Sequence, residues 1–258
     1  MSGQIRAELA KIRSTRTWIV LLAVMLGYVL LNTIVLLVID LLPQDGGGED
    51  VPGVPTIANE QGVRNVWASA GGGYVITLIL GLLVITTEYR HRTLTSTFLA
   101  QPRRLRVVAA KLAGAAAASF AFAVVTCVAV AAVAVPVLAA RDAYALPAAD
   151  IAAILAGGVL GSTLFGVLGV AVGTLVRNQV AAIVGGLVWL LLGEALLIAF
   201  LPSVGKWLPG GAANSLVQAT SFQGEALLSP GVAAVVLLGY TAVLVGIAAA
   251  TTLRRDVT

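Results

Sequence analysis

Six apolar runs, each long enough to cross a lipid bilayer as a helix, dominate this 258-residue sequence. A bilayer core needs about 20 consecutive apolar residues in helical form. The runs cover residues 18–42, 67–87, 112–138, 151–176, 180–201 and 231–253. Only 11% of the residues are charged, whereas soluble domains carry about 25%. The sequence therefore predicts an all-α integral membrane protein, a single transmembrane domain over residues 1–258 with six transmembrane helices.

Basic residues fall mainly on one side of the predicted membrane. Lys and Arg in short loops are retained on the cytoplasmic side. With the N-terminus inside, thirteen of the sixteen Lys and Arg residues lie on that side, and Arg64, Arg141 and Lys206 lie outside. We therefore expect both termini in the cytoplasm. We also expect the net charge of +4 to reflect membrane insertion and not nucleic-acid binding.

Residues 1–16, before the first run, have the pattern of an interfacial helix. Ile5, Leu9 and Ile12 recur at helical spacing on one face, and basic residues lie toward the other sides. A helix of this kind lies in the headgroup layer of the membrane and does not cross it. The alternative is a basic tail that only orients the first span.

Glycine pairs at four-residue spacing mark the fourth run. They are Gly157 with Gly161 and Gly169 with Gly173. Helices in lipid approach closely where such small residues face each other. We interpret these pairs as packing within one subunit in preference to a dimer seam.

The sequence lacks several kinds of chemistry. It has no phosphate-binding G-x-x-x-x-G-K-[ST] pattern, so we expect no ATP site in this chain. The one histidine, His91, has no second His or Cys near it, and Cys127 stands alone in the third run. A metal site or a Ser/His catalytic pair is therefore not expected. We predict no cofactor in this chain and no enzyme activity of its own.

Glu194 is the one ionisable residue well inside an apolar run. A charged carboxylate near mid-bilayer costs roughly 2.5 kcal/mol on insertion scales, so such a residue faces protein or water. Two interpretations stay open at this point. Glu194 belongs either to a transport pathway or outer gate, or to a structural anchor that bonds the outer loops.

The segment at 202–230, between the fifth and sixth runs, is longer than a turn requires. Residues 208–211, Leu-Pro-Gly-Gly, are expected to break the chain, and residues 213–222 to form a short helix. We expect this outer segment to cap the exit side of a pathway. The alternative is a surface loop anchored by Trp207 at the membrane interface.

Residues 88–106, EYRHRTLTSTFLAQPRRLR, lie between the second and third runs on the cytoplasmic side. Leu94 and Phe98 share one face at four-residue spacing, and Pro102 ends the helix-compatible part, because helix is disfavoured before a proline. A loop that only holds topology needs the bases, but it does not need an exposed Leu and Phe. We therefore expect this segment to engage a partner that supplies energy.

These residues also carry a family resemblance. The run from Glu88 to Leu94, followed by Pro102, Arg103, Arg104 and Lys111, is similar to the cytoplasmic signature of ABC transporter permeases of the type-2 exporter superfamily. The basic N-terminal segment, the six runs, and a Glu in the fifth run followed by a Pro-containing outer segment extend the resemblance over nearly the whole chain. Arg92 departs from the Gly that similar proteins often carry there.

The resemblance implies a coupling helix that docks on a separate ATP-binding subunit. The residues assigned to this coupling are Glu88, Tyr89, Arg90, His91, Arg92, Thr93, Leu94, Phe98, Pro102, Arg103 and Arg104. Similar proteins work as two permeases with two ATPases, and ATP with Mg²⁺ binds to the ATPases. The expected function is export of a hydrophobic or amphipathic substrate, such as a drug, lipid or peptide, across a bacterial plasma membrane, with a second copy of this chain as the other half of the pathway.

Two alternatives belong to other classes. An ion-coupled secondary transporter would use Glu194 as its proton or sodium site and would work without an ATPase. A noncatalytic membrane subunit would anchor other proteins, and it would bind an ATPase without any substrate flux.

Overall fold

The computed structural model describes residues 7–8, 10–11, 14–39, 56–90, 104–176, 178–219 and 227–254 of the chain. Within these ranges the regular elements are all helices. They are α2 (Thr17–Val38), α3 (Glu60–Ala68), η2 (Ser69–Gly73), α4 (Tyr74–Arg90), α6 (Arg104–Ala140), α7 (Ala148–Val176), α8 (Gln179–Val188), η3 (Trp189–Glu194), α9 (Ala195–Phe200), α10 (Pro202–Gly205), α11 (Pro209–Leu216) and α12 (Pro230–Arg254).

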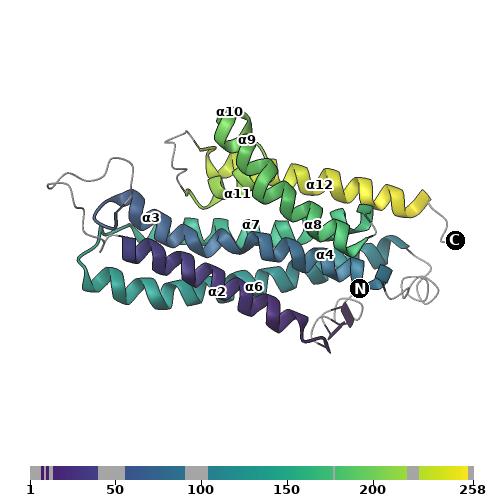
Figure 1. Cartoon of the computed structure of the whole chain (residues 1–258), viewed down its shortest axis with the longest axis horizontal. Coiled ribbons are helices and arrows are strands. Elements are labelled where there is room, and N and C mark those ends of the chain that lie inside the picture. Colours follow the sequence, from purple (N-terminus) through teal and green to yellow (C-terminus); the bar gives the residue numbers. More distant parts are fainter. Residues whose placement is uncertain are drawn as a thin grey trace.

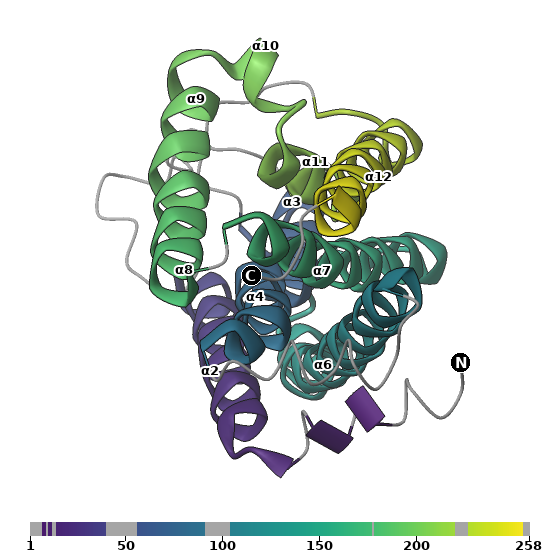
Figure 2. The same cartoon turned by 90° about the vertical axis from the view of Figure 1, so that its right-hand side faces the viewer.

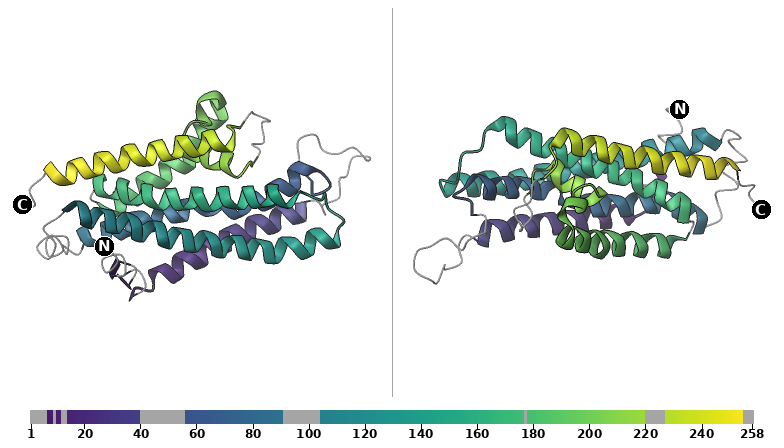
Figure 3. Two further views of the ribbon diagram at one scale, coloured as in Figure 1. Left: turned by 180° about the vertical axis from the view of Figure 1, so that it is seen from behind. Right: turned by 90° about the horizontal axis from the view of Figure 1, so that it is seen from above.

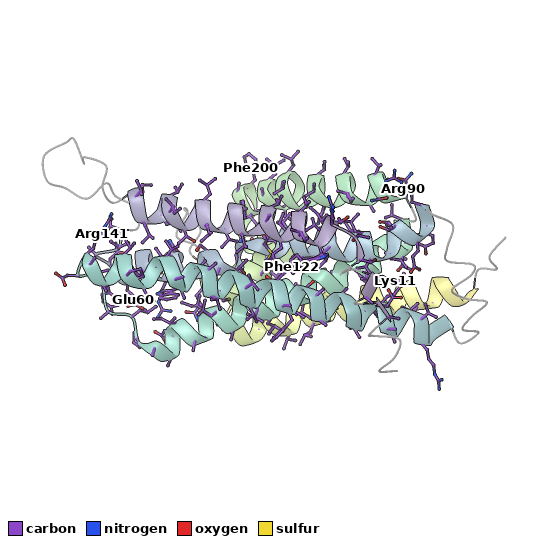
Figure 4. All side chains as sticks on the ribbon, turned by 90° about the horizontal axis from the view of Figure 1, so that it is seen from below. Lys11, Glu60, Arg90, Phe122, Arg141 and Phe200 are labelled. Atoms are coloured by element: carbon purple, nitrogen blue, oxygen red, sulfur yellow. The ribbon has the colours of Figure 1, made fainter. Side chains whose placement is uncertain are left out.

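Six helical stretches are long and apolar enough to cross a membrane. They are Thr17–Val38, Glu60–Arg90, Arg106–Ala140, Ala148–Val176, Gln179–Phe200 and Pro230–Ala250. This confirms the predicted all-α class and the number of spans. Large apolar side chains on the outside of the bundle, such as Phe200 at its edge in Figure 4, suit contact with lipid. The chain has the features of a multi-pass membrane protein.

α4 and α7 form the centre of the bundle. Seen along the long axis in Figure 2, α2 and α6 lie on one side of this pair, and α8, α9 and α12 lie on the other. Glycines allow the two central backbones to touch. A Cβ added at Gly81 would collide with the carbonyl oxygen of Gly166, and one added at Gly169 would collide with that of Leu78. This close approach is packing within one subunit, as we inferred for the glycine pairs of the fourth run.

The second span begins earlier than the sequence predicts. We expected it to start at Trp67, but the helical stretch starts at Glu60. The Asn59 side chain caps it by accepting a hydrogen bond from the Gly62 amide at 2.8 Å. Glu60 and Arg64 then pair along the helix at 2.8 Å, so their charges do not end it. Ser69–Gly73 continues the span as a 3₁₀ segment.

The short helix of the outer segment also starts earlier than predicted. We expected residues 208–211 to break the chain, but α11 begins at Pro209 and runs to Leu216. Proline is favoured at the first helical position, because the amide hydrogen that it lacks has no partner there in any helix. The prediction of a start at residue 213 was therefore wrong. Its predicted end at residue 222 lies outside the described residues.

The helix ends gather at two opposite ends of the bundle. Figures 1 and 3 show that α12 finishes at the end where α2 begins. Figure 4 places Lys11 and Arg90 at this end, and Glu60 and Arg141 at the opposite end. Arg141 donates a hydrogen bond to the Leu37 carbonyl at 2.8 Å, which caps the far end of α2. Below, the first is called the Lys11 end and the second the Arg141 end.

Candidate functional site

The predicted coupling residues lie at the Lys11 end. Glu88, Tyr89 and Arg90 form the last turn of α4, and Arg104 is the first residue of α6. Arg90 is exposed, and Tyr89 donates a hydrogen bond to the Thr174 carbonyl of α7 at 3.5 Å. The other coupling residues, His91, Arg92, Thr93, Leu94, Phe98, Pro102 and Arg103, lie outside the described residues. So do Ile5, Leu9 and Ile12 of the predicted interfacial helix.

Glu88 points into the protein and joins an ion cluster. Its Oε1 accepts hydrogen bonds from Lys111 at 2.6 Å and from Lys11 at 3.0 Å. Glu8 completes the set, because its two oxygens accept from Lys11 at 3.1 Å and Lys111 at 3.2 Å. We call these four residues, Glu8, Lys11, Glu88 and Lys111, the Glu88 cluster. It connects the N-terminal segment to the end of α4 and the start of α6.

Lys111 is the most buried member of the Glu88 cluster, with 1% of its side chain exposed. Glu8 and Glu88 are also buried, each with a side chain 10% exposed. A buried charge is tolerated when opposite charges and hydrogen bonds surround it, and removing one partner leaves the others uncompensated. Two lysines and two glutamates balance in this cluster. Its formal charge is therefore zero.

Sequence reasoning missed this cluster. It assigned Glu88 to the coupling residues and named Lys111 only as part of the family signature. A Glu and a Lys of opposite charge that directly flank two consecutive runs were the available signal, since ionisable residues at the edge of a span need water or a partner. Glu8, in the N-terminal segment, gave no such signal.

The pKa of Lys11 reflects the cluster. Burial lowers this pKa, but the hydrogen bond and charge of Glu88, followed by those of Glu8, raise it more, so it lies above its ordinary value of 10.5. The stability that Lys11 contributes is therefore present in full below pH 10.5 and is lost as the pH rises through the folded-state pKa. The contribution is small, because 53% of the Lys11 side chain is exposed.

We expect a small melting-temperature difference between the wild type and Lys11→Gln that stays constant from neutral pH to pH 10.5 and shrinks above it. Glu8, Glu88 and Lys111 face the same site in both proteins, so the comparison isolates Lys11. Thermal unfolding of the two proteins in detergent at stepped pH measures the difference. A difference that grows above pH 10.5 would contradict the assigned role of Lys11.

At the Arg141 end, Arg64 links three elements through its three guanidinium nitrogens. Nε donates to Glu60 of α3 at 2.8 Å, Nη2 to Asp150 of α7 at 2.7 Å, and Nη1 to Gln218 after α11 at 2.6 Å. The planar guanidinium presents these donors in a rigid fork. Sequence analysis placed Arg64 in an outer loop and gave it no role. The structure makes it the tie between α3, α7 and the outer segment.

Glu194 is 1% exposed and binds the outer segment. Oε2 accepts from the Gly210 amide of α11 at 2.6 Å, and Oε1 accepts from the Trp189 indole at 3.0 Å. No Lys or Arg of the described ranges lies within ion-pairing distance of this carboxylate. Of the two interpretations left open above, these contacts are the ones that an anchor of the outer loops requires. They also place Glu194 against the first turn of α11.

Within the part of the chain that the structure describes, no three His, Cys, Asp or Glu side chains gather as metal ligands would. Comparison of the sequence with models of known protein families and with curated proteins gives no match.

Proposed function

We propose that this chain is the permease subunit of an ATP-driven ABC exporter and that residues 88–106 dock a separate ATP-binding subunit. Six membrane-crossing helices support a transporter. The order of motifs along the sequence supplies the resemblance to ABC permeases of the type-2 exporter superfamily.

The Glu88 cluster is the observation that carries the proposal. The docking segment begins in the last turn of α4 and ends in the first turn of α6, and Glu88 and Lys111 join these two helices at 2.6 Å. Glu8 and Lys11 add the N-terminal segment to the same unit. Separating buried partners leaves uncompensated charge. A push on the docking segment would therefore move α4, α6 and the N-terminal segment together.

In this proposal two copies of the chain enclose the pathway and two ATPases bind ATP with Mg²⁺ below them. The span made of α8, η3 and α9 is the least buried of the six. It exposes Trp189, Leu192 and Phe200 to whatever surrounds one copy. Lipid or a second copy can cover such a surface. The cargo is a hydrophobic or amphipathic molecule, exported across a bacterial plasma membrane.

Co-purification tests the docking assignment. The chain is expressed with the ATPase encoded beside it and purified through a tag on this chain. We expect the wild type to retain the ATPase and the double variant Leu94→Asp, Phe98→Asp to lose it, because two charges would enter an apolar contact. The matched control is Ser96→Asp, Ala100→Asp, which adds the same charges on the opposite face of the predicted helix and should retain the ATPase.

Loss in both double variants, or in neither, would contradict docking through Leu94 and Phe98. If the wild type itself binds no ATPase, the ion-coupled alternative becomes the leading one. That alternative predicts transport by this chain alone and loss of ion coupling in Glu194→Gln. The anchoring alternative predicts a bound ATPase without substrate flux.

A further inference from the structure

α11 lies inside the bundle, although it belongs to the connection between the last two spans. Of its eight residues, Gly210–Ala213, Ser215 and Leu216 are buried. Its C-terminal end fits against glycines of two other spans. A Cβ added at Gly157 of α7 would collide with the Leu216 carbonyl oxygen, and one added at Gly71 of η2 would lie 2.6 Å from Val217 Cγ1. α11 therefore packs closely against the backbone of these two spans, and this buried position is called its slot below.

The side chains of α11 offer little apolar contact area in this slot. Its sequence is PGGAANSL, with one large apolar residue, Leu216. Hydrophobic stabilisation grows with the apolar area that leaves water. Van der Waals contact likewise grows with the number of touching atoms. Glycine and alanine supply little of either through their side chains, so close backbone packing, as at Gly157, and polar contacts near the two ends of α11 hold it in place.

Polar contacts hold α11 at its start and just after its end, and these two contacts are called clasps below. At the start, the Glu194 carboxylate accepts the Gly210 amide hydrogen at 2.6 Å. An anion is favoured there, because the first amides of a helix have no partner within it and carry partial positive charge. At the other end, Gln218 accepts from Arg64 at 2.6 Å. Gln218 has a φ of 56°, a left-handed conformation that ends the helix turn.

The first clasp belongs to the span with the least burial. Glu194 ends η3, a π-helical segment in the middle of that span. A π-helical turn contains an extra residue and changes the direction of the side chains that follow. The Arg64 clasp, in contrast, is tied to α3 and α7 by two ion pairs. A shift of the fifth span would therefore release the start of α11 and leave its end pinned.

We propose that α11 is the outer gate of the transport pathway and that the bond from Gly210 to Glu194 is the latch that keeps it closed. This inference rests on the proposed function for the pathway itself. The first turn of α11 leaves its slot when the hydrogen bond from Gly210 to Glu194 breaks, while Arg64 keeps its hydrogen bond to Gln218. Glu194 acts here as a positioning residue for the gate.

Labelling of a single cysteine tests the latch. Ser215 is fully buried and donates to the Gly211 carbonyl at 2.8 Å. The reporter is Ser215→Cys in a Cys127→Ala background, since Cys127 is the chain's one cysteine. The full complex with its ATPase, in nanodiscs, is treated with a membrane-impermeant maleimide. We expect slow labelling of the reporter alone, because α11 is seated.

Two latch variants should label faster. In Glu194→Gln, one of the two donors, the Gly210 amide or the Trp189 indole, faces the side-chain NH₂ in place of a carboxylate oxygen. The NH₂ is itself a donor and cannot accept that hydrogen bond. In Gly210→Ala, the added Cβ would lie 2.5 Å from Glu194 Oε2 and displace it. We expect at least about a tenfold increase in labelling rate, since a hydrogen bond to a charged group is worth more than one factor of ten. Gly185→Ala is the matched control on the same span, because an added Cβ there meets nothing within 4 Å.

Addition of Mg·ATP separates a gate from a fixed anchor. For a gate, Mg·ATP raises the labelling rate of the reporter, and Glu194→Gln is already fast without it. Unchanged rates in both latch variants, or equal increases in Gly185→Ala, overturn the latch, and no response of the reporter to Mg·ATP overturns the gate. If no ATPase co-purifies but the latch variants label faster, the ABC assignment fails and the latch stands.

Discussion

Lys111→Met is expected to lower the free energy of unfolding by about 3–5 kcal/mol, the cost of breaking a buried ion pair by removing one partner. Lys111 is 1% exposed and donates to both Glu88 and Glu8. Without it, two buried carboxylates share the single charge of Lys11, whose side chain is 53% exposed. The uncompensated negative charge destabilises the junction between the N-terminal segment, α4 and α6. Thermal unfolding in detergent measures the loss.

A double variant separates charge balance from simple loss of the lysine. Glu88→Met together with Lys111→Met removes one charge of each sign and leaves Glu8 paired with Lys11 at 3.1 Å. Replacing both partners of a buried pair by apolar residues of similar volume is often close to neutral. We therefore expect the double variant to recover most of the stability that Lys111→Met loses. Lys206→Met is the matched lysine control and should melt as the wild type does.

If the double variant melts lower than Lys111→Met alone, the cluster is not a balanced set of charges.

The same variants also test the proposed function. The double variant restores stability but removes the direct link between α4 and α6. Under the proposed function it should therefore give less transport per ATP hydrolysed than the wild type.

Gly169→Ala is the second change with a large expected effect. An added Cβ at Gly169 would collide with the Leu78 carbonyl oxygen and lie 2.9 Å from the Leu82 nitrogen and 3.0 Å from the Gly81 Cα. All three are backbone atoms of α4, so no side chain can rotate out of the way. Overpacking of this kind costs about 1–3 kcal/mol, and it acts at the central contact of the bundle. We expect α4 and α7 to separate and the melting temperature to fall.

The control for Gly169→Ala is Gly239→Ala in α12, where an added Cβ meets nothing within 4 Å. Alanine is the better helix former by about 1 kcal/mol, so this control should melt at or above the wild-type temperature. The opposite signs expected for one and the same substitution make the comparison informative. Equal effects at both positions would show that α4 and α7 do not touch as the structure has them.

The six spans could be predicted from the sequence because lipid imposes a local rule. A helix satisfies its own backbone hydrogen bonds, so a sufficiently long apolar run is both necessary and nearly sufficient for a crossing. The same rule misplaced the start of the second span. Glu60 and Arg64 look like the end of an apolar run, but Asn59 caps a helix that includes both, Glu60 pairs with Arg64, and Arg64 pairs with Asp150.

Contacts between distant residues could not be predicted in this way. Glu8 and Lys111 are separated by 103 positions, and Lys11 and Glu88 by 77. Glu194 was recognised as unusual from its burial in an apolar run, but its partner was not, since Gly210 binds through its backbone amide. Any residue except proline has a backbone amide hydrogen to donate, so the residue type at position 210 does not identify it as the partner.

The sequence alone therefore determined the class of this protein, because hydrophobicity and length act residue by residue along the chain. Tertiary structure decided which charges neutralise each other, which glycines touch another backbone, and where α11 is seated. The physical reason is that a buried charge or a missing side chain has no fixed energy of its own. Its energy depends on what the fold brings within a few ångströms of it.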